Sequence, residues 1–239
     1  MMKKNLIVTL FMFLILAVST AQGTSEFFSR SDSFFKAYVK NGRVDYKAIK
    51  NNTAALDDLL VMAKGISVAK ENMNEYQAFW INGYNLAVIK GIIDNYPLKS
   101  PLDKAGFFDK TKYDIGGESI TLNDIENILL RKNFPKEPRF HFVLVCGGLG
   151  CPPIISQAYL PATLNDQLEK QAKLALNDPK FIQVDKGKVK ISQIFEWYKS
   201  DFENDGSVVD YINAHRSEQL PEKAKVSYYP YDWTLNDLK

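Results

Sequence analysis

The sequence predicts an α+β protein, a single helix-rich domain around a small mixed β-sheet with a buried central strand. Apolar residues recur at helical spacing over much of the chain, and short β-branched segments flank glycine-containing turns. One unbroken apolar run has the length of a strand that is covered on both faces. Helical and hairpin segments do not alternate regularly, which argues against a doubly wound sheet. With 46% hydrophobic residues, the chain has the composition of a globular protein rather than a disordered one.

The first 21 residues have the order of a cleaved secretory signal. Lys3 and Lys4 precede an apolar stretch, Leu6–Val18, and small residues follow up to Ala21. A retained membrane anchor is the weaker interpretation, because a helix needs about 20 residues to span a bilayer. We expect cleavage after Ala21, or after Gly23, and an exported protein that is periplasmic or secreted.

The rest of the chain has balanced charge. The signal segment holds two lysines and no acidic residue, so the formal charge of +2 belongs to it alone. A neutral surface of mixed sign gives no electrostatic footprint for nucleic acid, and no membrane span is expected after cleavage. We expect no cofactor from the sequence. We divide the remainder into a helical N-terminal extension at 22–73 and a domain at 74–239.

Helices come first along the chain. Apolar residues recur at helical spacing over 27–39 and 48–62, and most clearly over Asn74–Asn95. This last segment is interrupted by Asn82 and Asn85, which are three residues apart and therefore neighbours on one helix face. Because asparagine is a poor interior helix residue, we expect both side chains to bind a buried group or to line a cleft.

Hairpins and shorter helices fill the remaining chain. The expected elements are a hairpin over 112–120 around Gly116-Gly117, a helix over 122–132 capped by Thr121, a strand over 140–145, a helix from Pro161 to about Asn177, a hairpin over 181–191 around Lys186-Gly187, a short helix over 192–198 capped by Ser192, a helix over 208–215 and a strand over 226–231. The strand at 140–145 is the predicted central one, because its apolar run leaves no polar face for solvent.

Several motifs resemble those of one known family. They are Phe79-Trp80-Ile81-Asn82-Gly83-Tyr84-Asn85, Leu122-Asn123-Asp124-Ile125-Glu126, the segment from Pro138-Arg139-Phe140-His141-Phe142 to Cys151-Pro152-Pro153, Ser192–Tyr198 with Asp201-Phe202, and Tyr231-Asp232-Trp233-Thr234-Leu235-Asn236. Over about 74–236 the chain resembles the uncharacterised "domain of unknown function" family numbered 547, which brings no established activity. The resemblance implies relatives among exported bacterial proteins and within larger plant and animal proteins. The family usually has histidine after the Asp-Ile-Glu motif where this chain has Asn127, which argues against a mechanism that needs that imidazole.

Both cysteines lie in one glycine-rich segment, Arg139–Pro153. At a strand period of two, His141 and Cys146 point to opposite faces and should not pair directly. Cys151 follows three glycines and precedes Pro152, which favours a helix start where backbone N–H groups and the helix dipole stabilise a thiolate. The glycines also let N–H groups approach a substrate closely, as an oxyanion hole requires.

The leading functional hypothesis is therefore a thiol-dependent acyl hydrolase or transferase. Cys151 is the predicted nucleophile, His141 the general base with His215 in reserve, and Glu126 the orienting carboxylate. A small molecule or a peptide is the expected ligand. The predicted substrate-binding residues are Asn82, Asn85, Trp80 and Gly148.

Each of these residues also has a structural interpretation. Cys146 fits a packed strand face, Cys151 fits a packing thiol or a short disulfide with Cys146, and His141 fits a hydrogen-bonded core histidine. The aromatic residues around Trp80 fit a core better than a ligand platform. A non-enzymatic binding domain with an aromatic cleft is the second function. A redox dithiol ranks lower because the Cys-x-x-Cys spacing is missing, and a metal site ranks lower because the usual zinc spacing is missing.

Overall fold

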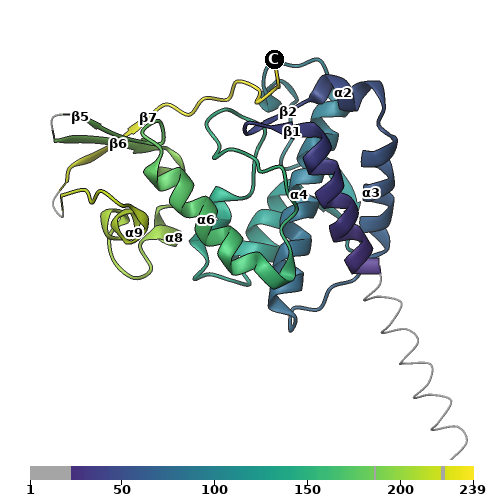
Figure 1. Cartoon of the computed structure of the whole chain (residues 1–239), viewed down its shortest axis with the longest axis horizontal. Coiled ribbons are helices and arrows are strands. Elements are labelled where there is room, and N and C mark those ends of the chain that lie inside the picture. Colours follow the sequence, from purple (N-terminus) through teal and green to yellow (C-terminus); the bar gives the residue numbers. More distant parts are fainter. Residues whose placement is uncertain (1–22, 186, 222–223) are drawn as a thin grey trace, which may run out of the picture.

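The helices and strands pack into two adjoining regions (Figure 1), and their chain order is the predicted one except at 39–44, where two short strands were not expected, and at 140–145. The computed structural model describes residues 23–185, 187–221 and 224–239. The expected signal at 1–21 lies outside the described residues. The α+β class is confirmed, because helices dominate and the strands form only small sheets.

The larger region is built around one central helix, α4 (Met73–Asn95). Every residue from Tyr76 to Ile89 is buried, so this helix is surrounded by protein on all sides. The elements before it pack against it and share its core. They are a helix over 23–38, the antiparallel pair β1 (Val39–Lys40) and β2 (Arg43–Val44), α2 (Tyr46–Asn51) and α3 (Ala54–Gly65).

The first predicted hairpin is confirmed. β3 (Lys112–Ile115) pairs antiparallel with β4 (Glu118–Thr121), after a short turn of helix, η1 (Pro101–Asp103). Gly116 and Gly117 both have positive φ, as the tight turn between two such strands requires. A Cβ on Gly116 would lie 2.6 Å from the indole of Trp80, so this turn also closes over the core.

The helix after this hairpin contains a π-helical stretch. Thr121 caps α5 (Leu122–Asp124) by accepting from the Asp124 N–H, as predicted. The chain then widens into a π-helix, η2 (Ile125–Arg131). π-helical turns are rare and occur often at functional sites, and this one carries Glu126.

The predicted central strand at 140–145 is wrong. The segment starts as a 3₁₀ helix, η3 (Pro138–Phe142), and continues without strand pairing. The Asn85 amide takes the place of a neighbouring strand: it donates to the Val143 carbonyl at 3.0 Å and accepts from the Val145 N–H at 2.9 Å. An apolar run without a period fits a buried irregular segment as well as a buried strand.

The second region combines a long helix with a mixed sheet and short helices. The predicted mixed sheet is confirmed, with the order β5-β6-β7 and with β6 as its central strand. β6 pairs antiparallel with β5 and parallel with β7. The elements are η4 (Pro161–Thr163), α6 (Leu164–Asn177), β5 (Ile182–Asp185), β6 (Lys188–Ser192), α7 (Ile194–Trp197), α8 (Lys199–Phe202), α9 (Val208–His215) and β7 (Val226–Tyr229).

Two apolar clusters form the core, one for each region, and η3 contributes to both. Phe140 belongs to the first cluster and Phe142 to the second, so His141 lies at their boundary. In Figure 1, α6 crosses the middle of the molecule, and the C-terminal segment returns from β7 to the β1–β2 pair. There Leu238 N–H donates to the Val44 carbonyl at 2.9 Å.

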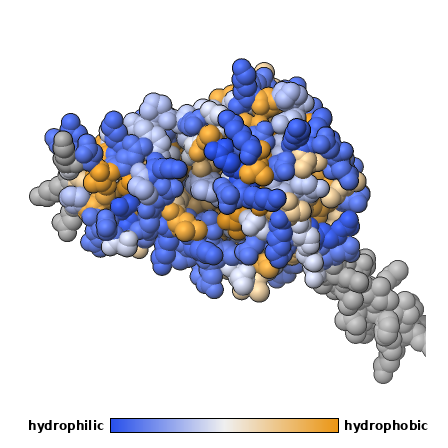
Figure 2. Space-filling view, turned by 45° about the horizontal axis from the view of Figure 1, so that its top comes forward, coloured by the Kyte–Doolittle hydropathy of each residue, from blue (hydrophilic) through white to orange (hydrophobic). Residues whose placement is uncertain are grey.

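The described surface is mainly polar. Figure 2 shows one face on which hydrophilic side chains dominate and apolar ones form small separate patches. Among the described residues, no helix has both the length and the apolar character that crossing a membrane would require.

Candidate functional site

One small pocket at the junction of the two regions is lined by all three predicted catalytic residues. Glu126 comes from η2, His141 from η3 and Cys151 from the glycine loop, residues 147–151. The pocket has a volume of about 60 Å³. Its other lining residues are Tyr84, Leu144, Cys146, Ile194, Trp197, Tyr198, Tyr231 and Trp233.

The two cysteines in this pocket form a disulfide, with Cα atoms 6.5 Å apart. The Tyr231 hydroxyl donates to Cys151 Sγ at 2.8 Å and lies 3.1 Å from Cys146 Sγ. The backbone N–H of Cys146 also points at Cys151 Sγ, at 3.0 Å. Burial raises the pKa of the Tyr231 phenol well above its ordinary value, so the hydroxyl keeps its proton and remains a donor.

Cys151 does not begin a helix, contrary to the prediction. Residues 151–160 have no regular secondary structure, and the next helical turn starts at Pro161. A helix dipole therefore does not act on this sulfur. Its hydrogen-bond donors are the Tyr231 hydroxyl and the Cys146 N–H instead.

The glycine loop packs closely against the C-terminal segment, and this corrects the expectation of an open oxyanion hole. A Cβ on Gly148 would lie 3.1 Å from the Asp232 carbonyl oxygen, and one on Gly150 would lie 2.9 Å from the Tyr231 ring. Three N–H groups of the loop are already bonded: Leu149 to Thr234 O at 2.8 Å, Gly150 to Asp232 O at 2.7 Å and Cys151 to Gly148 O at 3.2 Å.

A larger groove of about 530 Å³ lies against the same loop. Gly148, predicted to bind substrate, lines this groove and is not among the residues of the small pocket. Cys151 lines both spaces, so it separates the groove from the pocket.

His141 is buried and is oriented by Asp201, not by Glu126. Its Nε2 lies 2.8 Å from the Asp201 carboxylate, and its ring stacks on Tyr198 with a centroid separation of 4.0 Å. Arg131 binds the same carboxylate through Nε at 2.7 Å and a terminal nitrogen at 3.0 Å. Burial alone would raise the pKa of Asp201, but the hydrogen bonds from His141 and Arg131 outweigh it and hold that pKa far below its ordinary value.

Asn127, where the family resemblance implies a histidine, lies behind this network. Its amide donates to the Asn123 carbonyl at 3.0 Å, and its oxygen accepts from Arg131. Arg131 in turn binds Asp201, and Asp201 binds His141. Asn127 is not among the pocket-lining residues, and its hydrogen bond with Arg131 links it to the pocket histidine.

Glu126 lies among phenol groups. Burial raises the pKa of Tyr84 and of Tyr198, and the nearby Glu126 charge raises both further. No ion pair among the described residues involves Glu126. Its partners are the phenols of Tyr84 and Tyr198, and its charge also acts on Arg131, although the two do not form an ion pair.

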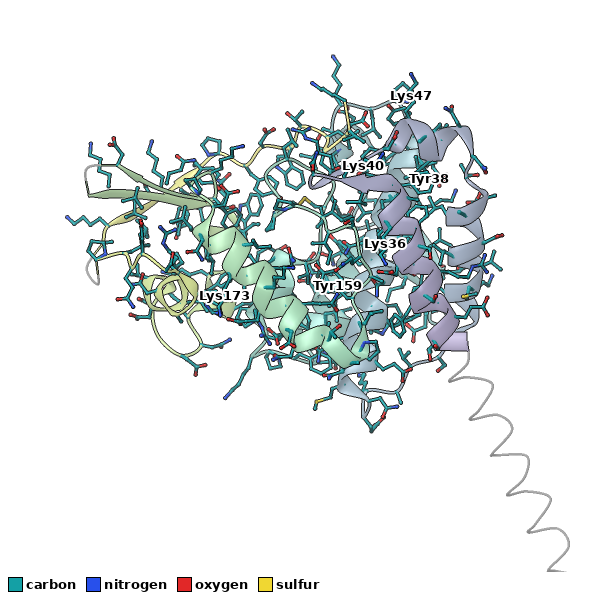
Figure 3. The ribbon with its side chains drawn as sticks, viewed as in Figure 1. Lys36, Tyr38, Lys40, Lys47, Tyr159 and Lys173 are labelled. Atoms are coloured by element: carbon teal, nitrogen blue, oxygen red, sulfur yellow. A yellow bond between two sulfur atoms is a disulfide. The ribbon has the colours of Figure 1, made fainter. Side chains whose placement is uncertain are left out.

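The two asparagines of α4 bind backbone and not the pocket. Asn82 is fully buried, and its amide donates to the Tyr159 carbonyl at 2.7 Å and accepts from the Tyr159 N–H at 3.0 Å. Figure 3 labels Tyr159 between α6 and the N-terminal helices. Asn85 holds the 143–145 segment in the same way. The expectation that both bind a buried group is confirmed, but neither they nor Trp80, a buried core residue, line the small pocket or the groove beside it, as substrate binding there would require.

His215, the reserve base, lies in a different groove beside Arg139 and Glu169. Its Nδ1 is 2.9 Å from the Tyr211 carbonyl, and its Nε2 is 3.7 Å from Glu169. It therefore cannot serve the cysteine pocket. Within the described part of the chain, no group of three or more potential metal ligands is close enough to hold an ion.

Sequence reasoning missed Asp201 as the partner of His141, and it missed Tyr231, Trp197 and Trp233 as pocket walls. All four lie in motifs that were noticed, but nothing local indicated which way they face. No curated protein and no solved structure is detectably similar to the chain. Residues 68–174, which include Glu126, His141 and both cysteines, match the family model "Protein of unknown function, DUF547", and this confirms the family resemblance over that part of the chain.

Proposed function

We propose that the protein is a thiol-dependent acyl transferase or hydrolase whose nucleophile, Cys151, is released when its disulfide with Cys146 is reduced. The observation that supports this proposal is the shared pocket of Cys151 and His141, with His141 fixed by Asp201 at 2.8 Å. Reduction takes two electrons and two protons from an external dithiol and yields two thiols. The disulfide form is then the resting state.

In the reduced state the roles follow from the hydrogen bonds. His141 Nε2 is held by Asp201, so Nδ1 is the nitrogen that takes the proton of the Cys151 thiol. The Tyr231 hydroxyl and the Cys146 N–H stabilise the thiolate. The thiolate adds to the acyl carbon, the leaving group departs with the proton from His141, and the acyl-thioester is resolved by water or by another acceptor.

Cys146→Ser is the sharpest test, because it frees Cys151 from the disulfide without changing any other pocket residue. We expect this variant to react with iodoacetamide at Cys151 and to hydrolyse p-nitrophenyl esters without a reductant. The wild type should do both only after treatment with a dithiol, and Cys151→Ser should do neither. The proposal fails if reduced wild type and Cys146→Ser release no more p-nitrophenol than Cys151→Ser, with all three folded by circular dichroism.

Thiol–disulfide exchange is a second candidate, supported by the contact of the Tyr231 hydroxyl with both sulfurs. In exchange, a partner thiolate attacks one sulfur, and the displaced Cys146 or Cys151 thiolate leaves. This function predicts that Cys146→Ser traps a mixed disulfide with a disulfide-containing peptide, because the Cys151 thiolate displaces one thiol of the peptide and no Cys146 remains to release the other. Trapping without any esterase activity would favour exchange over acyl transfer.

We also infer export from the signal-like segment at 1–21. N-terminal sequencing of the protein from its native cells should find a mature chain that starts at Gln22 or Thr24. A mature protein that still begins at Met1 and remains inside the cell would contradict export.

A further inference from the structure

We propose that the small pocket beside the disulfide binds the head of an organic cation, a primary or methylated ammonium group. The group would lie between the Glu126 carboxylate and the aromatic rings of Trp197, Tyr231 and Trp233. The aromatic walls, the charge and the volume of the pocket each support this ligand class.

The aromatic walls come from two segments that meet only in the fold. The ring centroids of Trp197 and Tyr231 are 5.0 Å apart, and those of Tyr231 and Trp233 are 4.8 Å apart. Trp197 is 46% exposed, so it stands at the mouth of the pocket, between the other walls and solvent. Aromatic faces attract cations within about 6 Å of the ring centroid, and Trp and Tyr do so best.

The charge in the pocket favours a cation over an anion. Glu126 contributes a carboxylate with no ion-pair partner among the described residues. Arg131, the nearest guanidinium of the network, is held by Asp201 through two bonds and also lies over the Tyr198 ring at 4.6 Å. The charge of Glu126 acts on Arg131 through space and helps to raise the pKa of Arg131, but the hydrogen bonds of that guanidinium go to Asp201 and Asn127. Glu126 therefore has neutral phenol partners, Tyr84 and Tyr198, and no ion pair of its own among the described residues.

The volume restricts the size of the group that can enter. A water-sized group needs about 10–15 Å³ of such cavity volume, so about 60 Å³ has room for roughly four heavy atoms. An ammonium or a small methylated ammonium head fits this space, and a whole metabolite does not. The rest of the ligand must remain outside, past Trp197.

This ligand has a chemical consequence that rests on the proposed function. A primary amine bound here lies in the same pocket as Cys151 and can accept an acyl group from its thioester. The ammonium first loses one proton to Glu126, and its nitrogen then forms a C–N bond as the C–S bond breaks. The second nitrogen proton passes to the Cys151 thiolate through His141, which leaves an amide and a free thiol.

The test measures binding alone, on the oxidised full-length protein, in which Cys151 cannot react. Choline is the probe, and 3,3-dimethyl-1-butanol is its neutral isostere, in which carbon replaces the charged nitrogen. Two of the three tryptophans of the chain line the pocket, so tryptophan fluorescence reports binding, with calorimetry as a second measurement. Ionic strength is held constant with sodium chloride.

We expect choline to bind and the neutral alcohol not to bind. Glu126→Gln and Trp197→Ala should each raise the choline Kd at least tenfold. Glu196→Gln, which removes an exposed carboxylate from the same helix as Trp197, should leave that Kd unchanged. Equal binding of choline and its isostere, or an unchanged Kd in Glu126→Gln, would overturn the inference. Because no thiol chemistry takes part, a failed esterase test leaves this result intact, and a failed binding test leaves the esterase result intact.

Discussion

At the scale of single residues, the Tyr231 hydroxyl and the Asp201 carboxylate make the polar contacts to the two groups on which the proposed function depends. Tyr231 approaches both sulfurs from the C-terminal segment, and Asp201 fixes the ring of His141 from α8. Under the proposed function, Tyr231 is the donor to the nucleophilic sulfur and Asp201 is the residue that orients the base.

Tyr231→Phe should make the reduced protein a poorer nucleophile, because it removes a donor to the thiolate and keeps the ring. Hydrogen bonds to charged groups contribute about 1.5–3 kcal/mol, so we expect alkylation of Cys151 at neutral pH to slow roughly tenfold. The rate of iodoacetamide labelling, read by mass, measures this. Tyr211→Phe is the matched control, since its buried hydroxyl has no partner among the described residues. Equal rates for wild type and Tyr231→Phe would show that the hydroxyl does not act on the sulfur.

Asp201→Asn should destabilise the protein in a pH-dependent way. The pKa of Asp201 is lowered by folding, so its ionised form contributes stability at pH values above the ordinary Asp pKa of about 3.9. That contribution is lost as pH falls from there through the lowered pKa of the folded state. We expect the variant to lose about 1–3 kcal/mol near neutral pH, because Arg131 and His141 lose the negative charge and one of the two acceptor oxygens that bind them.

Urea unfolding at a series of pH values measures this difference. The gap between wild type and Asp201→Asn should be full above about pH 5 and should shrink below about pH 4. A gap that grows as pH falls would contradict the assignment of the lowered pKa to Asp201.

At the scale of elements, most helices and the β3–β4 and β5–β6 hairpins could be predicted because their signals are local, whereas the two-residue strands β1 and β2 were not predicted. Thr121 caps its helix, and paired glycines make the β3–β4 turn, as short-range chemistry requires. The 140–145 segment could not be predicted, because its backbone partner is a side chain, Asn85, 58 and 60 residues away along the chain. The location of the site was predictable from its motifs. Its geometry was not, since His141 meets Asp201 across 60 residues and Cys151 meets Tyr231 across 80.

Asn85→Ala should show that this amide replaces a missing strand. It leaves the Val143 carbonyl and the Val145 N–H buried without their partner, which costs about 2–4 kcal/mol for two such groups. Urea unfolding measures the loss, and faster hydrogen exchange at the Val145 amide locates it. Asn51→Ala, at an exposed position, should stay within about 0.5 kcal/mol of wild type. An equally small loss in Asn85→Ala would mean that water satisfies both groups.

At the scale of the whole molecule, the C-terminal segment 231–238 completes the pocket by crossing between the two regions. It bonds to the glycine loop through Thr234 and to β2 and α2 through Asn236, whose side chain accepts from the Tyr46 hydroxyl at 2.7 Å. The same segment supplies Tyr231 and Trp233 to the pocket. Packing of this segment and assembly of the pocket are therefore one event.

Gly150→Ala tests this coupling without altering any pocket side chain. A Cβ at this position would lie 2.9 Å from the Asp232 backbone nitrogen and from the Tyr231 ring. The Asp232 backbone nitrogen cannot shift on its own to relieve this contact. The C-terminal segment must therefore move away from the glycine loop, and this moves the Tyr231 hydroxyl away from the sulfurs. Three changes should appear together: faster proteolysis near the C-terminus, a red shift in tryptophan emission and slower alkylation of the reduced Cys151.

Gly65→Ala is the control, because a Cβ there meets nothing within 4 Å. If Gly150→Ala behaves like Gly65→Ala in all three measurements, the packing of the segment and the structure of the pocket are independent. If only proteolysis becomes faster, Tyr231 is held in place by its aromatic neighbours rather than by the glycine loop.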